Sequence, residues 1–296
     1  MPRCSAIEAA KPDRVGGRGE PPATWGIQTV AAEFHWDPDQ YARFCEARSR
    51  PAVELLARLP ARRLRTIVDL GCGDGPVTAM LVERWPDARI AGVDSSSAML
   101  ERALTQCPTV EFVEADISTW QPVVPPDLIF SNAALHWVDD HAALFPRLAT
   151  MLAPGGLFAV QMPGNFDAPS HRLLAARVRS PRWAAKLGSK LRASPVADPD
   201  RYIDWLSPVA TNIDAWETTD HLLLEGENAV LEWMKGTALR PFLTALGPGD
   251  ARAFLDELGA DLADAYPRRP DGSTRFPFRR IYVVAERQTN SDTPTA

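Results

Sequence analysis

Two short segments constrain the fold of this chain more than any other feature of its sequence. The first, IVDLGCGDG at 67–75, is an apolar run that leads into a glycine-rich turn. The second, IAGVD at 90–94, is another apolar run and ends in the carboxylate of Asp94. In α/β proteins such a pair forms a nucleoside-binding crevice at the carboxyl ends of parallel strands. The sequence therefore predicts a nucleoside cofactor and leaves open which one.

Apolar runs alternate with helical patterns as far as residue 162, and this alternation predicts the fold class. Strands and helices at this spacing form an α/β, Rossmann-like, mostly parallel sheet with helices on both faces. After the two segments above, the expected elements are helices at 76–84 and 97–105, strands at 110–116 and 127–132, a helix at 141–152 and a strand at 157–162.

The pattern differs outside this alternating region. Before it we expect two helices, one with Tyr41, Phe44 and Arg48 on a single face and one at 53–59. After residue 162 the expected elements are irregular helices at 170–206, a strand at 213–224, helices at 229–246 and 250–265, and a last strand at 279–286.

These elements predict one domain that spans residues 31–290. Helical insertions at about 165–212 and 226–275 are expected to cover the carboxyl edge of the sheet as a substrate lid. Residues 1–30 and 291–296 show no periodicity and are expected to be disordered.

Composition and charge exclude several classes of function. The 296 residues are 45% hydrophobic and 24% charged, as in ordinary globular proteins. The net charge of -6 argues against broad binding to nucleic acid or to anionic membranes, and no apolar run is long enough to span a membrane. The four cysteines form no zinc or redox pattern, so we expect no metal site and a reducing, cytoplasmic location.

The glycine turn favours S-adenosylmethionine over a dinucleotide. A dinucleotide fingerprint requires a third glycine on the helix, so that the pyrophosphate can sit at the helix N-terminus. This chain has Gly71, Gly73 and Gly75 in the turn but Pro76 at that position. The carboxylate of Asp74 would also repel a pyrophosphate, whereas S-adenosylmethionine carries no phosphate.

Polar side chains at the strand ends suit the parts of this cofactor. Asp69 is placed to help hold the ammonium group, and Asp94 can accept hydrogen bonds from both ribose hydroxyls or, alternatively, cap the next helix. Asp116 can accept the adenine amino hydrogen while Ile117 packs on the ring, or alternatively serve as a turn aspartate. Asn132 is expected to lie beneath the reactive part of the cofactor. The expected cofactor-binding residues are Asp69, Gly71, Gly73, Asp94, Ser95, Met99, Asp116, Ile117 and Asn132.

Residues 36–286 resemble the trans-aconitate 2-methyltransferases, which are class I S-adenosylmethionine-dependent methyltransferases. The glycine motif is common to the superfamily, whereas the Trp-Asp-Pro opening and the Leu-Arg-Pro motif are specific to the family. The motifs that carry the resemblance are WDPDQY at 36–41, RSRP at 48–51, DLGCG at 69–73, DSS at 94–96, EADI at 114–117, NAAL at 132–135, VQMP at 160–163 and GTALRP at 236–241.

The resemblance implies methylation of one carboxylate of a small polycarboxylate, trans-aconitate or a similar acid, to give a monomethyl ester. The sequence departs from the family pattern around the third motif glycine, where it has Asp74 and Pro76. It also has His136 in place of the usual Gln before Trp137, and DHL at 220–222 in place of an aromatic-rich stretch. The last two departures are expected near the acceptor pocket.

A polycarboxylate needs cationic partners, preferably planar guanidinium groups. Arg240 and His171 are favoured because the resemblance supports the motifs around them, although Arg240 could instead cap a helix end. Tyr41 and Trp137 could form pocket walls or pack in the core, and Arg48 is a further candidate. The remaining cationic candidates, for which ordinary ion pairs are the alternative, are Arg50, Arg279 and Arg280.

Other functions remain open at this point. A methyltransferase that acts on another small acid, or on a natural-product hydroxyl with His136, His171 or His221 as the base, is the first alternative. An NAD(P)-dependent oxidoreductase is a second, and the missing third glycine argues against it. A binding protein without catalytic activity is a third, and the intact cofactor motifs argue against it.

Overall fold

The computed structural model describes residues 45–289. The expected disordered segments at 1–30 and 291–296, and the candidate Tyr41, lie outside the described residues. Arg48 lies in the first described helix, α2, but only its backbone is described.

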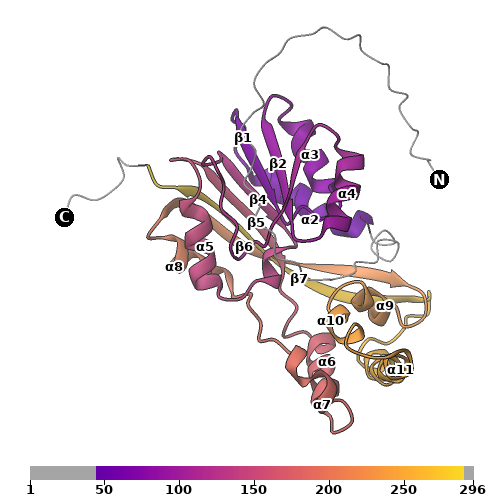
Figure 1. Cartoon of the computed structure of the whole chain (residues 1–296). Helices are drawn as coiled ribbons and strands as arrows, with labels where there is room; N and C mark the ends of the chain where they lie inside the picture. Colours follow the sequence, from indigo (N-terminus) through magenta and orange to yellow (C-terminus); the bar gives the residue numbers. More distant parts are fainter. Residues whose placement is uncertain (1–44, 290–296) are drawn as a thin grey trace, which may run out of the picture.

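The strands of this part of the chain form one seven-stranded sheet in the order β3-β2-β1-β4-β5-β7-β6 (Figure 1). The first five strands by sequence are parallel to one another, whereas β7 runs antiparallel to both β5 and β6. This arrangement confirms the expected Rossmann-like, mostly parallel sheet. The strands are β1 (Thr66–Leu70), β2 (Arg89–Asp94), β3 (Glu111–Glu114), β4 (Leu128–Asn132), β5 (Leu157–Pro163), β6 (Ala210–Glu225) and β7 (Ser273–Arg287).

Helices cover both faces of the sheet and form a separate group beyond one end of it (Figure 1). The helices of the described residues are α2 (Cys45–Arg58), α3 (Pro76–Arg84), α4 (Ser97–Gln106), η1 (Leu135–Trp137), α5 (His141–Thr150), α6 (Pro169–Arg179), α7 (Ala184–Leu187), η2 (Gly188–Lys190), α8 (Pro199–Leu206), α9 (Ala229–Lys235), α10 (Arg240–Leu243) and α11 (Pro248–Ala265). None of them is long and apolar enough to cross a membrane.

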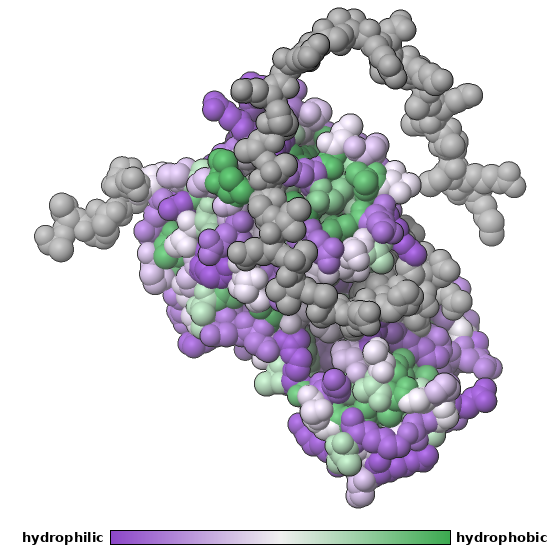
Figure 2. Space-filling model, in the orientation of Figure 1, coloured by the Kyte–Doolittle hydropathy of each residue, from purple (hydrophilic) through white to green (hydrophobic). Residues whose placement is uncertain are grey.

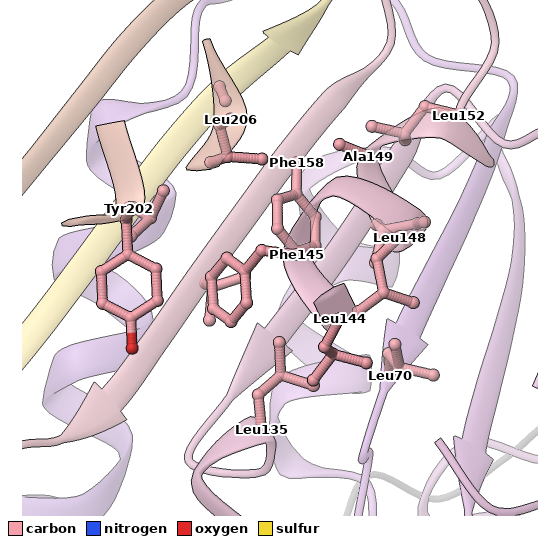
Figure 3. Packing of buried hydrophobic residues seen from close by; sticks show 14 of the residues in the cluster. Leu70, Leu135, Leu144, Phe145, Leu148, Ala149, Leu152, Phe158, Tyr202 and Leu206 are labelled. Carbon is pink, nitrogen blue, oxygen red and sulfur yellow. The ribbon is translucent and has the colours of Figure 1, made fainter. Parts of the chain in front are cut away.

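One face of the sheet packs against α5 and α8. Figure 3 shows Phe145 of α5, Phe158 of β5 and Tyr202 of α8 side by side in this core. The ring centroids of Phe145 and Tyr202 are 4.6 Å apart. Burial of such a side chain contributes about 1.5–3 kcal/mol. The buried His141 lies 2.8 Å from the Tyr202 hydroxyl and 3.0 Å from the Leu135 carbonyl, so its polar atoms are satisfied within the core.

The opposite face of the sheet packs against α2 and α3. Leu55 of α2 and Leu81 of α3 are fully buried against Ile67 and Phe130 of the sheet. The alternation of side chains along each strand therefore sends neighbouring residues into two different cores. The strands β1, β2 and β4 lie between these two cores, and the glycine turn follows the carboxyl end of β1.

The helices α6, α7, α9, α10 and α11 form a third apolar cluster with the outer halves of β6 and β7. Because β5 ends at Pro163, which pairs with Arg280, residues 273–279 of β7 continue beyond the carboxyl end of β5 and pair there with β6. This helical unit therefore lies past the carboxyl edge of the sheet (Figure 1). Figure 2 shows hydrophobic side chains on its surface over α6 and α10.

The structure corrects several expected boundaries. The helix expected at 53–59 is the second part of one continuous helix, α2, which includes Pro51. The single helix expected at 229–246 is two helices, because the chain turns at Gly236 and Pro241 cannot continue a helical hydrogen-bond ladder. Part of the first expected insertion, α8, packs on the sheet with α5 and belongs to the main core.

Candidate functional site

The glycine turn brings β1 close to the end of β4. Gly71 has a left-handed φ of 81° and donates its backbone N–H to the Val93 carbonyl over 2.7 Å. A Cβ atom on Gly71 would lie 2.1 Å from the Cβ of Ala134, so only glycine fits this approach. The same point lies 3.4 Å from Cδ1 of Ile117. The turn, the end of β3 and the end of β4 therefore meet around Gly71.

Asp94 ties the glycine turn to the end of β2. The backbone N–H of Gly73 donates to Oδ2 of Asp94 and that of Ser96 donates to Oδ1, each over 3.0 Å. Burial raises the pKa of Asp94, and these two hydrogen bonds oppose that effect. The N-cap of α4 is Ser96, so Asp94 is not the cap of that helix. Each carboxylate oxygen keeps a lone pair that can accept a further hydrogen bond.

Asp69 lies below the turn rather than at its surface. Its carboxylate is 1% exposed and accepts a hydrogen bond of 2.6 Å from Oγ1 of Thr78 on α3. The pKa of Asp69 is raised to about 7, because burial and, to a smaller extent, the negative charge of Asp94 outweigh the opposing effect of the Thr78 hydrogen bond. The side chain expected to help hold the ammonium group therefore also fixes α3 to β1.

Replacing Asp69 with asparagine is expected to stabilise the protein increasingly as the pH rises. The pKa of this carboxyl is about 7 in the folded protein and 3.8 in the unfolded chain. Between these two pH values the unfolded chain ionises the carboxyl and the folded protein does not, so the folded wild type loses stability as the pH rises. The free energy of unfolding of Asp69→Asn, measured relative to that of the wild type, should therefore rise by roughly 4 kcal/mol between pH 4 and pH 7. Urea titrations of both proteins across this range measure the difference, and a constant difference would contradict the expectation.

The charges around the turn disfavour a pyrophosphate. Burial raises the pKa of the Cys72 thiol well above its usual range, and the negative charges of Asp69, Asp94 and Asp74 raise it further. A region in which several carboxylates act on one thiol repels anions and attracts cations. The helix α3 also starts with Pro76, which lacks the N–H group that a phosphate would need.

The other expected cofactor residues surround this turn. The buried Met99 places its Cε atom 3.5 Å from a Cβ built on Gly73, and the exposed Ser95 follows Asp94 directly. Asp116 is exposed, and its Oδ1 accepts hydrogen bonds from the backbone N–H and the hydroxyl of Ser118 over 2.8 and 2.7 Å. Asp116 therefore acts through Oδ1 as a turn aspartate, which is the alternative to its adenine-binding role.

Asn132 is the last residue of β4 and differs from its neighbours. Its Oδ1 atom is buried and has no hydrogen-bond partner among the described residues. The next residue, Ala133, has a left-handed φ of 53°, a conformation that strains any side chain other than glycine. An unsatisfied acceptor and a strained residue at a crevice are both typical of a ligand site.

The acceptor candidates lie on three different helices, α10, α6 and η1. Arg240 is 9% exposed and is the first residue of α10. His171 lies in the first turn of α6, with its ring 5.6 Å from that of Phe166. Burial lowers the pKa of His171 to about 4. Trp137 is 41% exposed, which contradicts the alternative of core packing for this residue.

The remaining arginines expected near the acceptor form ion pairs. Arg50 pairs with Glu54 at the surface, and Arg279 pairs with Asp198 and Glu217. Arg280 is 4% exposed, with its Nε 2.7 Å from Asp220. The departure from the family pattern at Asp220 therefore forms a buried ion pair between β6 and β7, while His221 beside it is exposed.

Two further polar residues of this region were not singled out as binding residues from the sequence. Gln161 of β5 is fully buried, and neither of its side-chain polar atoms has a partner among the described residues. The signal was present, because Gln161 interrupts the otherwise apolar run at 157–162. His136, considered only as a base, has a buried Nδ1, and burial lowers its pKa to about 3.

Comparisons with known proteins agree with this geometry. Residues 67–156 match the family model described as a methyltransferase domain. A putative methyltransferase from Bacillus halodurans C-125 is similar in fold, with a TM-score of 0.53, 12% identity, and coverage of 81% of this chain and 100% of that one. The YcgJ protein from Bacillus subtilis gives a TM-score of 0.52, 15% identity and the same coverage. At these identities the structures show the shared fold alone.

Similar sequences extend over nearly the whole of their own length. The trans-aconitate 2-methyltransferase of Azoarcus sp. (strain BH72) is 46% identical over 252 residues, which is 85% of this chain and 99% of that protein. The trans-aconitate 2-methyltransferase of Rhodococcus jostii (strain RHA1) is 48% identical over 255 residues, 86% of this chain and 100% of that protein. With this identity and coverage, the chain belongs to the trans-aconitate 2-methyltransferase family of S-adenosylmethionine-dependent methyltransferases.

Proposed function

We propose that this protein forms a monomethyl ester on trans-aconitate or a closely similar small polycarboxylate. The observation that carries the proposal is the 46–48% identity over 99–100% of the length of the relatives, because it includes the acceptor half as well as the cofactor half. The buried Arg240 of α10 and the buried amides at the ends of β4 and β5 are polar groups of the kind that such an acceptor requires.

The residues of the crevice fit the parts of S-adenosylmethionine. Asp94 would accept from the ribose hydroxyls, Ile117 and Met99 would pack on either side of the adenine, and Asp116 would accept from its amino group. The unsatisfied Oδ1 of Asn132 would face the positive charge of the sulfonium. Asp69, beneath the turn, would act on the ammonium group through its charge.

The cofactor supplies a methyl group on a positively charged sulfur, which a carboxylate oxygen can displace in line. A carboxylate is ionised at neutral pH, so no residue of the chain has to remove a proton. The residues have to orient the acceptor and exclude water, which strengthens the attraction between the two charges. The carboxylate loses its charge in the reaction, so Arg240 and other cationic groups should hold the carboxylates that do not react.

The rate of esterification at saturating S-adenosylmethionine, where the charge of Asp69 no longer limits cofactor binding, is expected to be flat between about pH 6 and pH 8.5. His171 and His136 have pKa values lowered to about 4 and about 3 by burial, so both are neutral throughout this range. A hydroxyl acceptor would need a base whose pKa lies near the working pH, and these values make both histidines poor bases. Measuring kcat/KM against pH tests this. A steep rise through the histidine range that is lost in His171→Ala would favour the hydroxyl alternative.

The proposal is tested most simply with a panel of acceptors. Purified protein and labelled S-adenosylmethionine are incubated with trans-aconitate, other tri- and dicarboxylates, and hydroxyl compounds of similar size. The expected result is the highest kcat/KM for trans-aconitate or a close relative of it. A preference for a hydroxyl compound, or equal activity on simple monocarboxylates, would contradict the proposed acceptor.

Two further expectations belong to this proposal. The helical unit of α6, α7 and α9–α11 would act as a lid, since it lies past the carboxyl edge of the sheet and contributes His171 and Arg240.

A cytoplasmic location without nucleic-acid or membrane partners stays a prediction, supported by the free thiols of Cys72 and Cys107 and by the net charge of -6.

A further inference from the structure

Gln161 is a buried amide whose hydrogen-bonding groups are not used within the described part of the protein. It is 0% exposed, and both Nε2 and Oε1 lack a hydrogen-bond partner there. The residues of β5 that share its face, Leu157 and Ala159, are apolar and pack in the core. A fully buried polar side chain without partners is costly, and such groups are retained where a ligand or a bound water completes them.

Gln161 stands in a row of polar residues across the sheet. The strand register places it between Asn132 of β4 and Tyr282 of β7, on the face that α2 covers. The hydroxyl of Tyr282 donates to Glu54 over 2.7 Å and is therefore satisfied. Asn132 has an unsatisfied Oδ1, so the two amides with unused groups are direct neighbours.

The order of the strands places Gln161 on the acceptor side of the crevice. Asp94 ends β2, Gly71 follows β1, Asn132 ends β4, and Gln161 lies on β5 at the register of Asn132. Neighbouring strands are about 4.8 Å apart, so β5 lies about 14 Å from β2. A cofactor with its ribose at Asp94 and its sulfonium above Asn132 would therefore present its methyl group toward Gln161.

We propose that Gln161 holds the reacting carboxylate of the acceptor. This inference depends on the proposed function, which supplies a carboxylate as the acceptor. The amide N–H would bind one carboxylate oxygen while the other oxygen attacks the methyl group. The new O–C bond forms as the S–C bond breaks, its electron pair passes to sulfur, and both the carboxylate and the sulfonium become neutral. No proton is transferred.

A neutral amide suits the reacting carboxylate better than an arginine does. The negative charge of this group disappears in the reaction, so a cationic partner would hold the ground state more strongly than the transition state. The carbonyl oxygen of the ester still accepts an N–H hydrogen bond, so the contact with Gln161 persists. Beside it, the unsatisfied oxygen of Asn132 would face the cation.

The test uses Gln161→Met, which keeps an unbranched side chain of similar shape but removes its polar atoms. We expect kcat/KM for trans-aconitate to fall by about 10- to 100-fold, the loss that one buried hydrogen bond produces. The affinity for S-adenosylhomocysteine, measured by calorimetry, should stay within about threefold, since no contact with the cofactor is removed. The melting temperature should not fall, because an unsatisfied buried group has been replaced by an apolar one.

Two further variants separate this role from a structural one. Val160→Ala changes the neighbouring buried residue on the opposite face, so it should lower the melting temperature and leave the KM for trans-aconitate unchanged. Gln161→Glu keeps the size of the side chain but replaces the N–H donor with a carboxyl group. Where the new carboxyl is ionised, it should lower kcat/KM for trans-aconitate further than Gln161→Met does, because like charges then meet.

The possible results are distinguishable. If wild type forms esters and Gln161→Met forms them as fast, the amide binds only water and this inference is wrong while the proposed function stands. If Gln161→Met loses affinity for S-adenosylhomocysteine with an unchanged acceptor KM, the amide serves the cofactor and the inference is again wrong. If wild type methylates hydroxyl compounds and no carboxylate, both the proposed function and the inference fail.

Discussion

Replacing Asp94 with alanine is expected to weaken the binding of S-adenosylhomocysteine by about 100-fold or more. On the proposed ribose assignment the variant loses two hydrogen bonds between a carboxylate and the ribose hydroxyls, and bonds to a charged group contribute about 1.5–3 kcal/mol each. It also loses the bonds by which Asp94 holds the backbone of Gly73 and Ser96 in place. Calorimetric titration of purified protein with S-adenosylhomocysteine measures the effect directly.

The matched control is Asp74→Ala, which removes a carboxylate from the same turn. Asp74 lies near enough to raise the pKa of Asp94, yet within residues 45–289 its side chain makes no hydrogen bond to the strand end. We expect the control to bind within about threefold of the wild type, because no hydrogen bond to the ligand is lost. If the two variants lose affinity equally, the turn contributes only its general negative charge and the ribose assignment is wrong.

Replacing Arg240 with methionine is expected to lower kcat/KM for trans-aconitate by about 100-fold, with the affinity for S-adenosylhomocysteine preserved. Arg240 is buried at the start of α10, and a guanidinium there can bind a carboxylate through two parallel hydrogen bonds. Methionine keeps most of the volume and removes the charge, so loss of packing contributes little. Steady-state kinetics with each substrate varied in turn separate the two effects.

Lysine at position 240 should recover part of the activity, since it restores the charge but not the paired donors. The control is Arg279→Met, which removes an arginine that already pairs with Asp198 and Glu217. It should leave the KM for trans-aconitate close to that of the wild type. An Arg240→Met protein that is folded and has unchanged kinetics would show that Arg240 is structural.

The fold of the first half was predictable because its local patterns and its packing agree. Apart from Asp69 and Gln161, the runs at 67–71 and 157–162 are apolar on both faces, as is typical of strands buried between two helical layers. The glycine turn was also predictable, because glycines directly after an apolar run indicate a turn that has no room for side chains. The structure agrees, since a Cβ atom on Gly71 would meet Ala134. Local sequence therefore determined the cofactor half.

The second half was less predictable because its boundaries depend on tertiary contacts. The break between α9 and α10 occurs within a continuous apolar pattern, and only Gly236 and Pro241 indicate it. The helix α8 resembles the irregular helices before it, yet Tyr202 fixes it to the main core through His141. No periodicity distinguishes a helix of the third apolar cluster from one that covers the sheet.

The candidate site was likewise predictable only in part from the sequence. The ends of the strands were identified from the sequence, because their positions follow from the sheet order. The depth of Asp69 was not, since burial beneath α3 depends on how the turn folds over it. The unsatisfied amide of Gln161 could be seen only once its neighbours across the sheet were known.

The central claim is that the crevice presents the methyl group of S-adenosylmethionine to a carboxylate. The most direct measurement is to incubate the purified protein with methyl-labelled S-adenosylmethionine and trans-aconitate, and then to treat the product with mild alkali. An ester releases its label as methanol, so the predicted result is a single labelled monomethyl product that alkali destroys. Label that remains on the product after alkali would show transfer to another kind of atom and would contradict the account.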